Sequence, residues 1–161
     1  MKFKKSLAKV VAAVSLAFAG FVAVNTVNTQ NNTVQAASKT SQCNKVVFLA
    51  KKQVGKRYVY GATGPNAFDC SGLTSYVYSH AIGKYISRTT YSQVYQGKTV
   101  KVSTASLKKG DLLFWGSKFS PYHVGIYVGG GQYVHAATPS QGVRKQYLSS
   151  YFWPSTAKRI I

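Results

Sequence analysis

Apolar residues recur at helical spacing in two segments of the chain. In residues 41–54 they stand at steps of four, three and four, which places them on one face of a helix that ends at Gly55. The positions on this face are Cys43, Val47, Ala50 and Val54. A cysteine on an apolar helix face is most simply a small buried hydrophobic residue.

A second helix is predicted from Cys70 to Ala81. Asp69 is suited to cap its N-terminus, and Gly83 ends it. Its apolar positions, four residues apart, are Leu73, Val77 and Ala81. Residues 56–68, between the two helices, are expected to be irregular because glycine and proline interrupt them.

The second half of the chain has the pattern of strands. The two central strands flank Gly129-Gly130-Gly131, which is a strong hairpin signal. The strands expected are 111–115, 122–128 and 132–137, with short edge strands at 143–147 and 157–161. Helices followed by strands predict an α+β fold, in which an antiparallel sheet packs on the helix that begins at Cys70.

The first 36 residues have the order of a secretory signal: a basic start, an apolar run and then small residues. The uninterrupted apolar run, residues 10–24, is shorter than the roughly 20 residues that span a bilayer, which favours cleavage over an uncleaved membrane anchor. Cleavage is expected after Ala36 or Ala37, with Ala17-Phe18-Ala19 as a second candidate. We therefore expect residues 1–36 to be a signal peptide and the processed protein to have no stable membrane span.

Residues 37–161 are expected to form one domain, which we take to be a monomer. This part of the chain carries 17 basic and two acidic residues, a formal charge of +15. Such a charge favours anionic partners, and the export signal favours wall polymers such as teichoic acids over nucleic acid. A surface charge that only keeps the protein soluble is the alternative.

The two acidic residues are Asp69 and Asp111, which are expected to have specific roles in a chain that otherwise avoids carboxylates. Two isolated carboxylates and three histidines provide no cluster at metal-ligand spacing. We therefore expect neither a metal nor another cofactor.

Cys70 is the candidate nucleophile because it stands in the first turn of the second helix. Unpaired backbone N–H groups and the helix dipole stabilise an anion there, and this placement lowers the pKa of a cysteine. The small neighbours Ser71 and Gly72 leave room for a substrate backbone and for amide donors near an oxyanion. A structural cysteine at a helix start is the alternative.

The general base must come from one of three histidines. His80 is ten residues along the helix, roughly 15 Å from the thiol, and is expected at the surface or at a cap. With a three-residue loop at 129–131, His135 opposes Gly125, so that His123 and His135 lie diagonally on one sheet face within roughly 8 Å. A two-residue loop would put them on opposite faces. If they share a face, one imidazole can orient the other.

At this point the chain resembles the NlpC-type cell-wall cysteine peptidases. The resemblance extends from about Cys43 to Ile161 and includes Tyr58, Gly61, Arg88-Thr89-Thr90, Gln93 and Gly110-Asp111-Leu112. Its most specific motifs are Phe68-Asp69-Cys70-Ser71-Gly72-Leu73, His123-Val124-Gly125-Ile126-Tyr127 and His135. Ala62 and Ala67 replace glycines that are frequent in the family, which implies altered loops.

The resemblance implies a compact papain-like α+β catalytic domain that hydrolyses peptidoglycan stem peptides, commonly between D-glutamate and the following diamino acid. By matching positions, Cys70 would be the nucleophile, His123 the base and His135 the residue that orients it. Tyr58 would help to bind substrate or the oxyanion. Asp69 and Ser71 would contact the free amino end of the stem peptide. Arg88 would bind a substrate carboxylate or form a structural ion pair with Asp111.

Two other functions remain open from the sequence: an amidase or acyltransferase with the same Cys-His chemistry on another wall bond, and a basic wall-binding module without activity. The expected location is the cell wall of a Gram-positive bacterium, after secretion. A Cys43–Cys70 disulfide would block the nucleophile, so we expect Cys43 to be buried and reduced.

Overall fold

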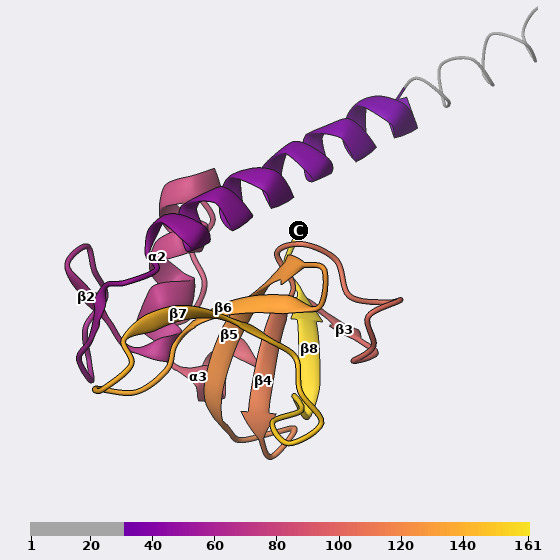
Figure 1. Ribbon diagram of the computed structural model, residues 1–161. Helices are drawn as coiled ribbons and strands as arrows, with labels where there is room; N and C mark the ends of the chain where they lie inside the picture. Colours follow the sequence, from indigo (N-terminus) through magenta and orange to yellow (C-terminus); the bar gives the residue numbers. More distant parts are fainter. Residues whose placement is uncertain (1–30) are drawn as a thin grey trace, which may run out of the picture. The chain divides into compact units, whose positions relative to one another are not determined.

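The computed structural model describes residues 31–161 and divides the chain into two units, Met1–Lys39 and Thr40–Ile161 (Figure 1). In the first unit, the described residues 31–39 are helical and exposed. Most of the predicted signal peptide, residues 1–30, lies outside the described residues. Within residues 31–161, no helix combines the length and the apolar character that crossing a membrane requires.

The second unit begins with a helix over residues 40–52, called here the N-terminal helix. Val47 and Ala50 are buried as predicted, but Val54 is 44% exposed, so its place on the buried face was a wrong prediction. The helix ends before Val54, and the chain turns inward at Gln53 instead. The buried Gln53 amide donates to the Leu49 carbonyl oxygen at 2.9 Å, which closes the last turn.

Helix α2 (Cys70–Ile82) agrees with the prediction at both ends. The Asp69 carboxylate accepts a hydrogen bond from the Gly72 backbone N–H at 2.6 Å, and Gly83 ends the helix in the left-handed region at φ +67°. On its predicted apolar face, Leu73 and Val77 are fully buried and Ala81 is partly buried. A short helix that the sequence analysis did not predict, α3 (Thr90–Gln93), follows.

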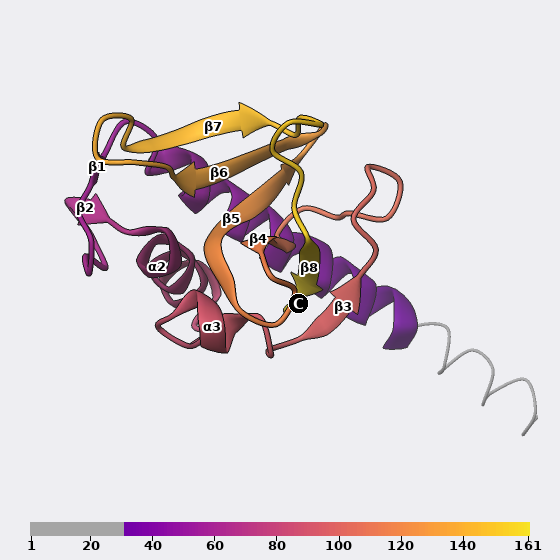
Figure 2. The same ribbon diagram turned by 90° about the horizontal axis from the view of Figure 1, so that it is seen from below.

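The strands of the second half form one six-stranded antiparallel sheet in the order β3-β8-β4-β5-β6-β7. Their bounds are β3 Lys98–Val100, β4 Leu112–Gly116, β5 Pro121–Gly129, β6 Gln132–Ala136, β7 Val143–Tyr147 and β8 Thr156–Arg159. All five predicted strands are present. Figure 2 shows β5 curving strongly, so that β6 and β7 turn away from β4 and β8.

Two details of the sheet differ from the prediction. β7 is an edge strand as predicted, but β8 is not, because it lies between β3 and β4. The short and mostly exposed β3 covers its outer edge, and the sequence analysis did not find β3. The segment predicted to be irregular also contains two short parallel strands, β1 (Arg57–Tyr58) and β2 (Ala67–Phe68).

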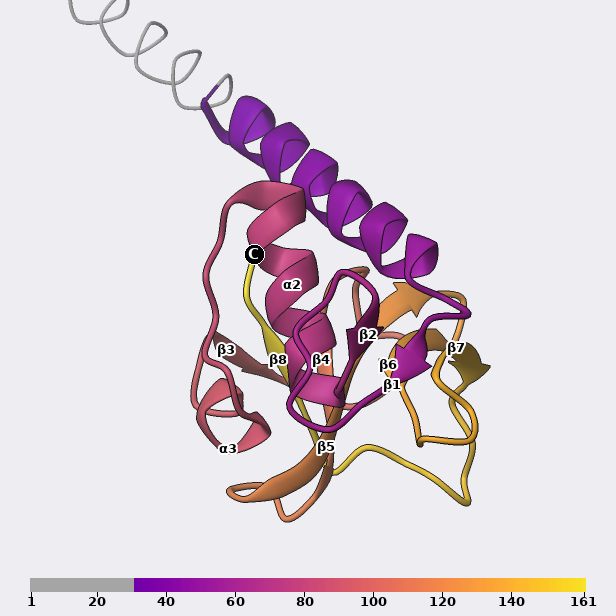
Figure 3. The same cartoon turned by 90° about the vertical axis from the view of Figure 1, so that its left-hand side faces the viewer.

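The sheet has an apolar cluster on each face. On one face, Leu112, Ile126 and Val134 pack with α2 and with the N-terminal helix. Figure 3 shows α2 in front of the sheet on this side. On the other face, Trp115 and Tyr133 belong to a second cluster. The predicted α+β fold, with an antiparallel sheet packed on the helix that begins at Cys70, is confirmed.

Candidate active site

The Cys70 thiol lies at the first residue of α2, next to strand β5. Cys70 is 9% exposed, and backbone hydrogen bonds from Val124, Ser71 and Cys70 itself favour its thiolate form. Burial has the larger effect, however, and raises the pKa of the Cys70 thiol, with a smaller increase from the Asp69 charge. The position at the helix terminus alone predicts a lowered pKa for this thiol, and its burial makes that prediction wrong.

The start of α2 is tied to the preceding loop. The Asp69 carboxylate accepts the Gly61 N–H at 2.8 Å, and the Asp69 N–H donates to the Ala62 carbonyl oxygen at 3.0 Å. A Cβ atom at Gly72 would lie 2.1 Å from that same Ala62 oxygen. The space beside Gly72 is therefore filled by the loop backbone, and it is not the open space for substrate that the sequence analysis expected.

The Gly72→Ala variant is expected to lose about 1–3 kcal/mol in its free energy of unfolding, because its methyl group must displace the Ala62 backbone. Urea denaturation measures this change. Ser79→Ala, on the same helix, is the comparison and is expected to cost less than about 1 kcal/mol, because its hydroxyl makes only local hydrogen bonds to the Tyr76 carbonyl and the His80 ring. An unchanged Gly72→Ala stability would contradict the close approach.

Asp69, Ser71 and Arg88 form one hydrogen-bonded network. The Arg88 guanidinium binds both Asp69 oxygens, at 3.0 and 2.5 Å, and its Nη1 also donates to Ser71 Oγ at 2.9 Å. The hydrogen bond to Asp69 raises the pKa of Arg88. The alternative of a structural ion pair between Arg88 and Asp111 is wrong, because Asp111 pairs with Arg159 at 2.7 Å.

Gln93, for which the sequence analysis gave no role, holds this network in place. Its buried side-chain amide donates to the carbonyl oxygens of Ser71 (3.1 Å) and Ser87 (2.7 Å). Its Oε1 accepts the Thr74 hydroxyl at 2.8 Å. Gln93 thereby fixes the segment before Arg88 against the first turn of α2. Its only signal in the sequence was its place in the family motif.

His123 on β5 and His135 on β6 contact one another, with His123 Nε2 2.8 Å from His135 Nδ1. The predicted register is confirmed, since Ile126 pairs with Val134. The predicted three-residue loop is wrong: the turn is Gly130–Gly131, and a bulge between Tyr127 and Gly129 supplies the additional residue. The bulge is the reason that a two-residue turn still leaves both histidines on one face.

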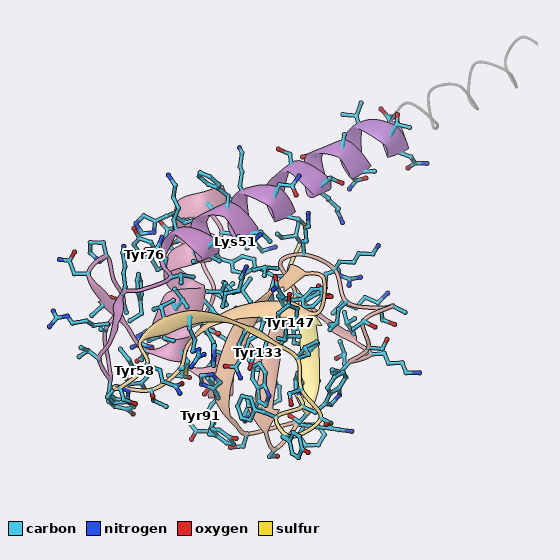
Figure 4. All side chains as sticks on the ribbon, viewed as in Figure 1. Lys51, Tyr58, Tyr76, Tyr91, Tyr133 and Tyr147 are labelled. Carbon is cyan, nitrogen blue, oxygen red and sulfur yellow. The ribbon has the colours of Figure 1, made fainter. Side chains whose placement is uncertain are left out.

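Aromatic rings and burial keep both imidazoles neutral. His123 and His135 are 8% and 4% exposed. The Trp115 ring centre is 5.5 Å from His123, and the Tyr133 ring, labelled in Figure 4, is 4.8 Å from His135. Burial lowers the pKa of His135 to about 4, and burial together with the His135 charge lowers the pKa of His123 to about 3. At neutral pH both rings are therefore uncharged.

Tyr58, labelled in Figure 4, is half-buried on β1. Burial raises the pKa of Tyr58, and negative charges on Cys70 and Asp69 raise it further, which indicates that its hydroxyl lies near both. The third histidine, His80, is exposed and stacks on Tyr76 at 4.0 Å, as expected for a surface residue.

Both cysteines are free thiols, but Cys43 is half-buried and not fully buried as predicted. Within residues 31–161, no group of three or more histidine, cysteine, aspartate or glutamate side chains could hold a metal ion. The described site brings together a thiol, a pair of neutral imidazoles and a tyrosine hydroxyl, beside the backbone N–H groups that begin α2.

Comparisons with known proteins identify the family of the chain. A family profile described as the NlpC/P60 family matches residues 55–161. A "Probable endopeptidase" of Corynebacterium glutamicum is 46% identical over 114 residues, which are 71% of this chain and 52% of that protein. The "Gamma-DL-glutamyl hydrolase" of Bacillus subtilis is 37% identical over 113 residues, 68% of this chain and 27% of that protein.

Among solved structures, the crystal structure of the NlpC/p60 domain of the peptidoglycan hydrolase SagA has a TM-score of 0.67 and 42% sequence identity. The match covers 73% of this chain and 97% of that domain. The chain thus spans nearly the whole of this solved domain, but only about half or less of the length of the two curated relatives.

Proposed function

The chain belongs to the NlpC/P60 family, and on this premise we propose that it is a secreted peptidoglycan endopeptidase in which Cys70 is the nucleophile and His123 the general base. The observation that carries the proposal is the contact of His123 with His135 at 2.8 Å, on the strand that also provides a backbone hydrogen bond to the Cys70 thiol. A thiol, a base and an orienting group is the arrangement that thiolate catalysis requires.

The proposed reaction begins with transfer of the Cys70 proton to the neutral His123. The sulfur attacks the scissile carbonyl carbon, and the resulting oxyanion is stabilised by backbone N–H groups at the start of α2 and by the Tyr58 hydroxyl. His123 then donates its proton to the leaving amine, and a thioester remains on Cys70. Water, deprotonated by His123, hydrolyses the thioester and restores the thiol.

We assign the scissile bond to the one between D-glutamate and the following diamino acid. A relative that is 37% identical is described as a gamma-DL-glutamyl hydrolase, which supports a glutamyl bond. Asp69, Ser71 and Arg88 provide a polar network of both charges beside the nucleophile. In this proposal Asp69 and Ser71 receive the free amino end of the stem peptide, and Arg88, whose side chain is 39% exposed, receives a substrate carboxylate.

Mass analysis of defined stem peptides, incubated with the protein and with Cys70→Ala, tests the assignment. Peptides with L-lysine and with diaminopimelate after D-glutamate are compared, each with a free or a blocked amino end. Cleavage after D-glutamate by the unaltered protein alone supports the proposal. Cleavage of another wall bond indicates a different Cys-His hydrolase, and the absence of any product from folded, reduced protein leaves a basic wall-binding module.

We also propose that the basic surface binds anionic wall polymers such as teichoic acids. Asp69 and Asp111 are the only acidic side chains in the chain; both are buried and each pairs with an arginine. In the described part of the chain, no acidic side chain therefore faces solvent to offset the lysines and arginines.

The affinity of the Cys70→Ala variant for purified walls is expected to fall about tenfold or more between about 50 and 500 mM salt, because mobile ions screen exposed charges. Co-sedimentation measures the bound fraction, and walls stripped of teichoic acid are the control. Binding that changes neither with salt nor after removal of the teichoic acid would rule this partner out.

A further inference from the structure

Gln146, on β7, extends the histidine pair by one more side chain. Its Oε1 lies 3.2 Å from His135 Nε2, and His135 Nδ1 lies 2.8 Å from His123 Nε2. The three residues stand on three neighbouring strands, where Tyr133 pairs with Gln146 and His135 pairs with Arg144. Because alternate residues of a strand share a face, Gln146 and both histidines project from the same side of the sheet.

The amide oxygen of Gln146 determines which nitrogen of His135 carries the proton. An amide oxygen accepts hydrogen bonds and cannot donate them, so His135 must donate from Nε2. A neutral imidazole has one donor and one acceptor, and Nδ1 of His135 is therefore the acceptor. Burial keeps His135 neutral at physiological pH by lowering its pKa to about 4.

The tautomer of His135 in turn determines the tautomer of His123. Because His135 Nδ1 accepts, the neighbouring His123 Nε2 must donate to it across 2.8 Å. The lone pair of the neutral His123 then lies on Nδ1, the nitrogen that is not engaged with His135. In the opposite arrangement, His135 would donate from Nδ1 and His123 would carry its proton on Nδ1, where no base would remain for a thiol.

We propose that Gln146 is a positioning residue that fixes the tautomers of His135 and His123 and so leaves His123 Nδ1 free to take the proton of Cys70. The inference rests on the proposed role of His123 as general base. The other groups around His135 do not provide this acceptor. Tyr133, on the same strand, contacts it ring against ring, and Arg144 from β7 only opposes a positive charge on it.

Nitrogen NMR of histidine-labelled protein tests the tautomers without any substrate. In the Cys70→Ala background, both His123 and His135 are expected to carry their proton on Nε2 at pH 7. Gln146→Met, which keeps the length of the side chain and removes the acceptor, is expected to produce a mixture of tautomers. Gln146→Glu keeps an acceptor and is expected to keep the Nε2–H forms. Gln141→Met, in an exposed turn, is the matched control and should change neither histidine.

Kinetics provide the second readout. Gln146→Met is expected to lower kcat about tenfold to a hundredfold with KM nearly unchanged, by analogy with the loss seen when the partner that orients a metal-binding histidine is removed. Gln146→Glu is expected to restore most of kcat. It should also move the acid limb of the kcat profile to higher pH, because a carboxylate stabilises the charged form of His135. The charge of Arg144 opposes this shift, and the titrations of His123, Tyr133 and Cys70 are coupled to it.

Two results would overturn the inference: unchanged tautomers in Gln146→Met, or an equal loss of kcat in the Met and Glu variants with both proteins folded. The NMR result does not depend on catalysis. If the unaltered protein cleaves no stem peptide, the proposed function fails, whereas altered tautomers in Gln146→Met would still support the positioning role.

Discussion

Replacing His123 with glutamine is expected to lower kcat/KM for stem-peptide cleavage by at least about 10⁴-fold. Burial raises the pKa of the Cys70 thiol, so little thiolate exists at neutral pH unless a base removes the proton. His123 is the group on β5 that can accept it, because burial keeps its ring uncharged and leaves one ring nitrogen with a free lone pair. Glutamine is similar in size and can still donate to His135 Nδ1, which separates the loss of the base from a loss of packing.

His135→Gln is the informative comparison, because it disturbs the orienting group and keeps the base. We expect a smaller loss of kcat/KM, about 10²- to 10³-fold, and a double variant no worse than His123→Gln alone, as for residues that act as one unit. The rate of Cys70 alkylation should fall in His123→Gln, with Cys43 in the same protein as a reference thiol. A His123→Gln variant within tenfold of full activity would remove His123 from the mechanism.

Local signals were enough to predict helix α2, but not the turn that brings the two histidines to one face. The Asp69 cap and the Gly83 terminus are decided by residues within one turn of each helix end, and the structure has both. The register of the β5–β6 hairpin was also correct, although the loop was not, because a bulge and a shorter turn together give the same pairing. The other residues of the site were predicted from the resemblance to the NlpC-type peptidases, which gives positions in the sequence and no distances.

Properties that depend on distant parts of the chain were predicted less well. The raised pKa of Cys70 results from burial by segments far away in sequence. The choice of Asp69 over Asp111 by Arg88 depends on Gln93, which anchors the segment before Arg88 to α2. The interior position of β8 depends on β3, whose three residues carry too weak a pattern to be recognised alone. Gln146 has no sequence signal, because its role exists only across three strands.

The free energy of unfolding is expected to fall steeply between about pH 6.5 and pH 4. The pKa values of His123 and His135 are lowered to about 3 and about 4 in the folded protein, below the ordinary value of 6.5. In this range the unfolded chain binds two protons that the folded protein does not, so stability is fully present above 6.5 and is lost as the pH falls. The slope approaches about 3 kcal/mol per pH unit, and the total loss by pH 4 is on the order of 5 kcal/mol.

A loss of this size is comparable to the whole stability of many domains, so the protein is expected to unfold near pH 4. Urea denaturation at pH 7, 6, 5 and 4 measures the slope. A His123→Gln/His135→Gln variant should lose most of it, whatever its absolute stability, because the two buried bases are gone. His80→Gln removes an exposed histidine and should keep the slope.

With two acidic side chains in the chain, few other groups can bind protons in this range. A double variant with an unchanged slope would mean that the pair is protonated in the folded state, and the neutral resting site from which the mechanism starts would have to be abandoned.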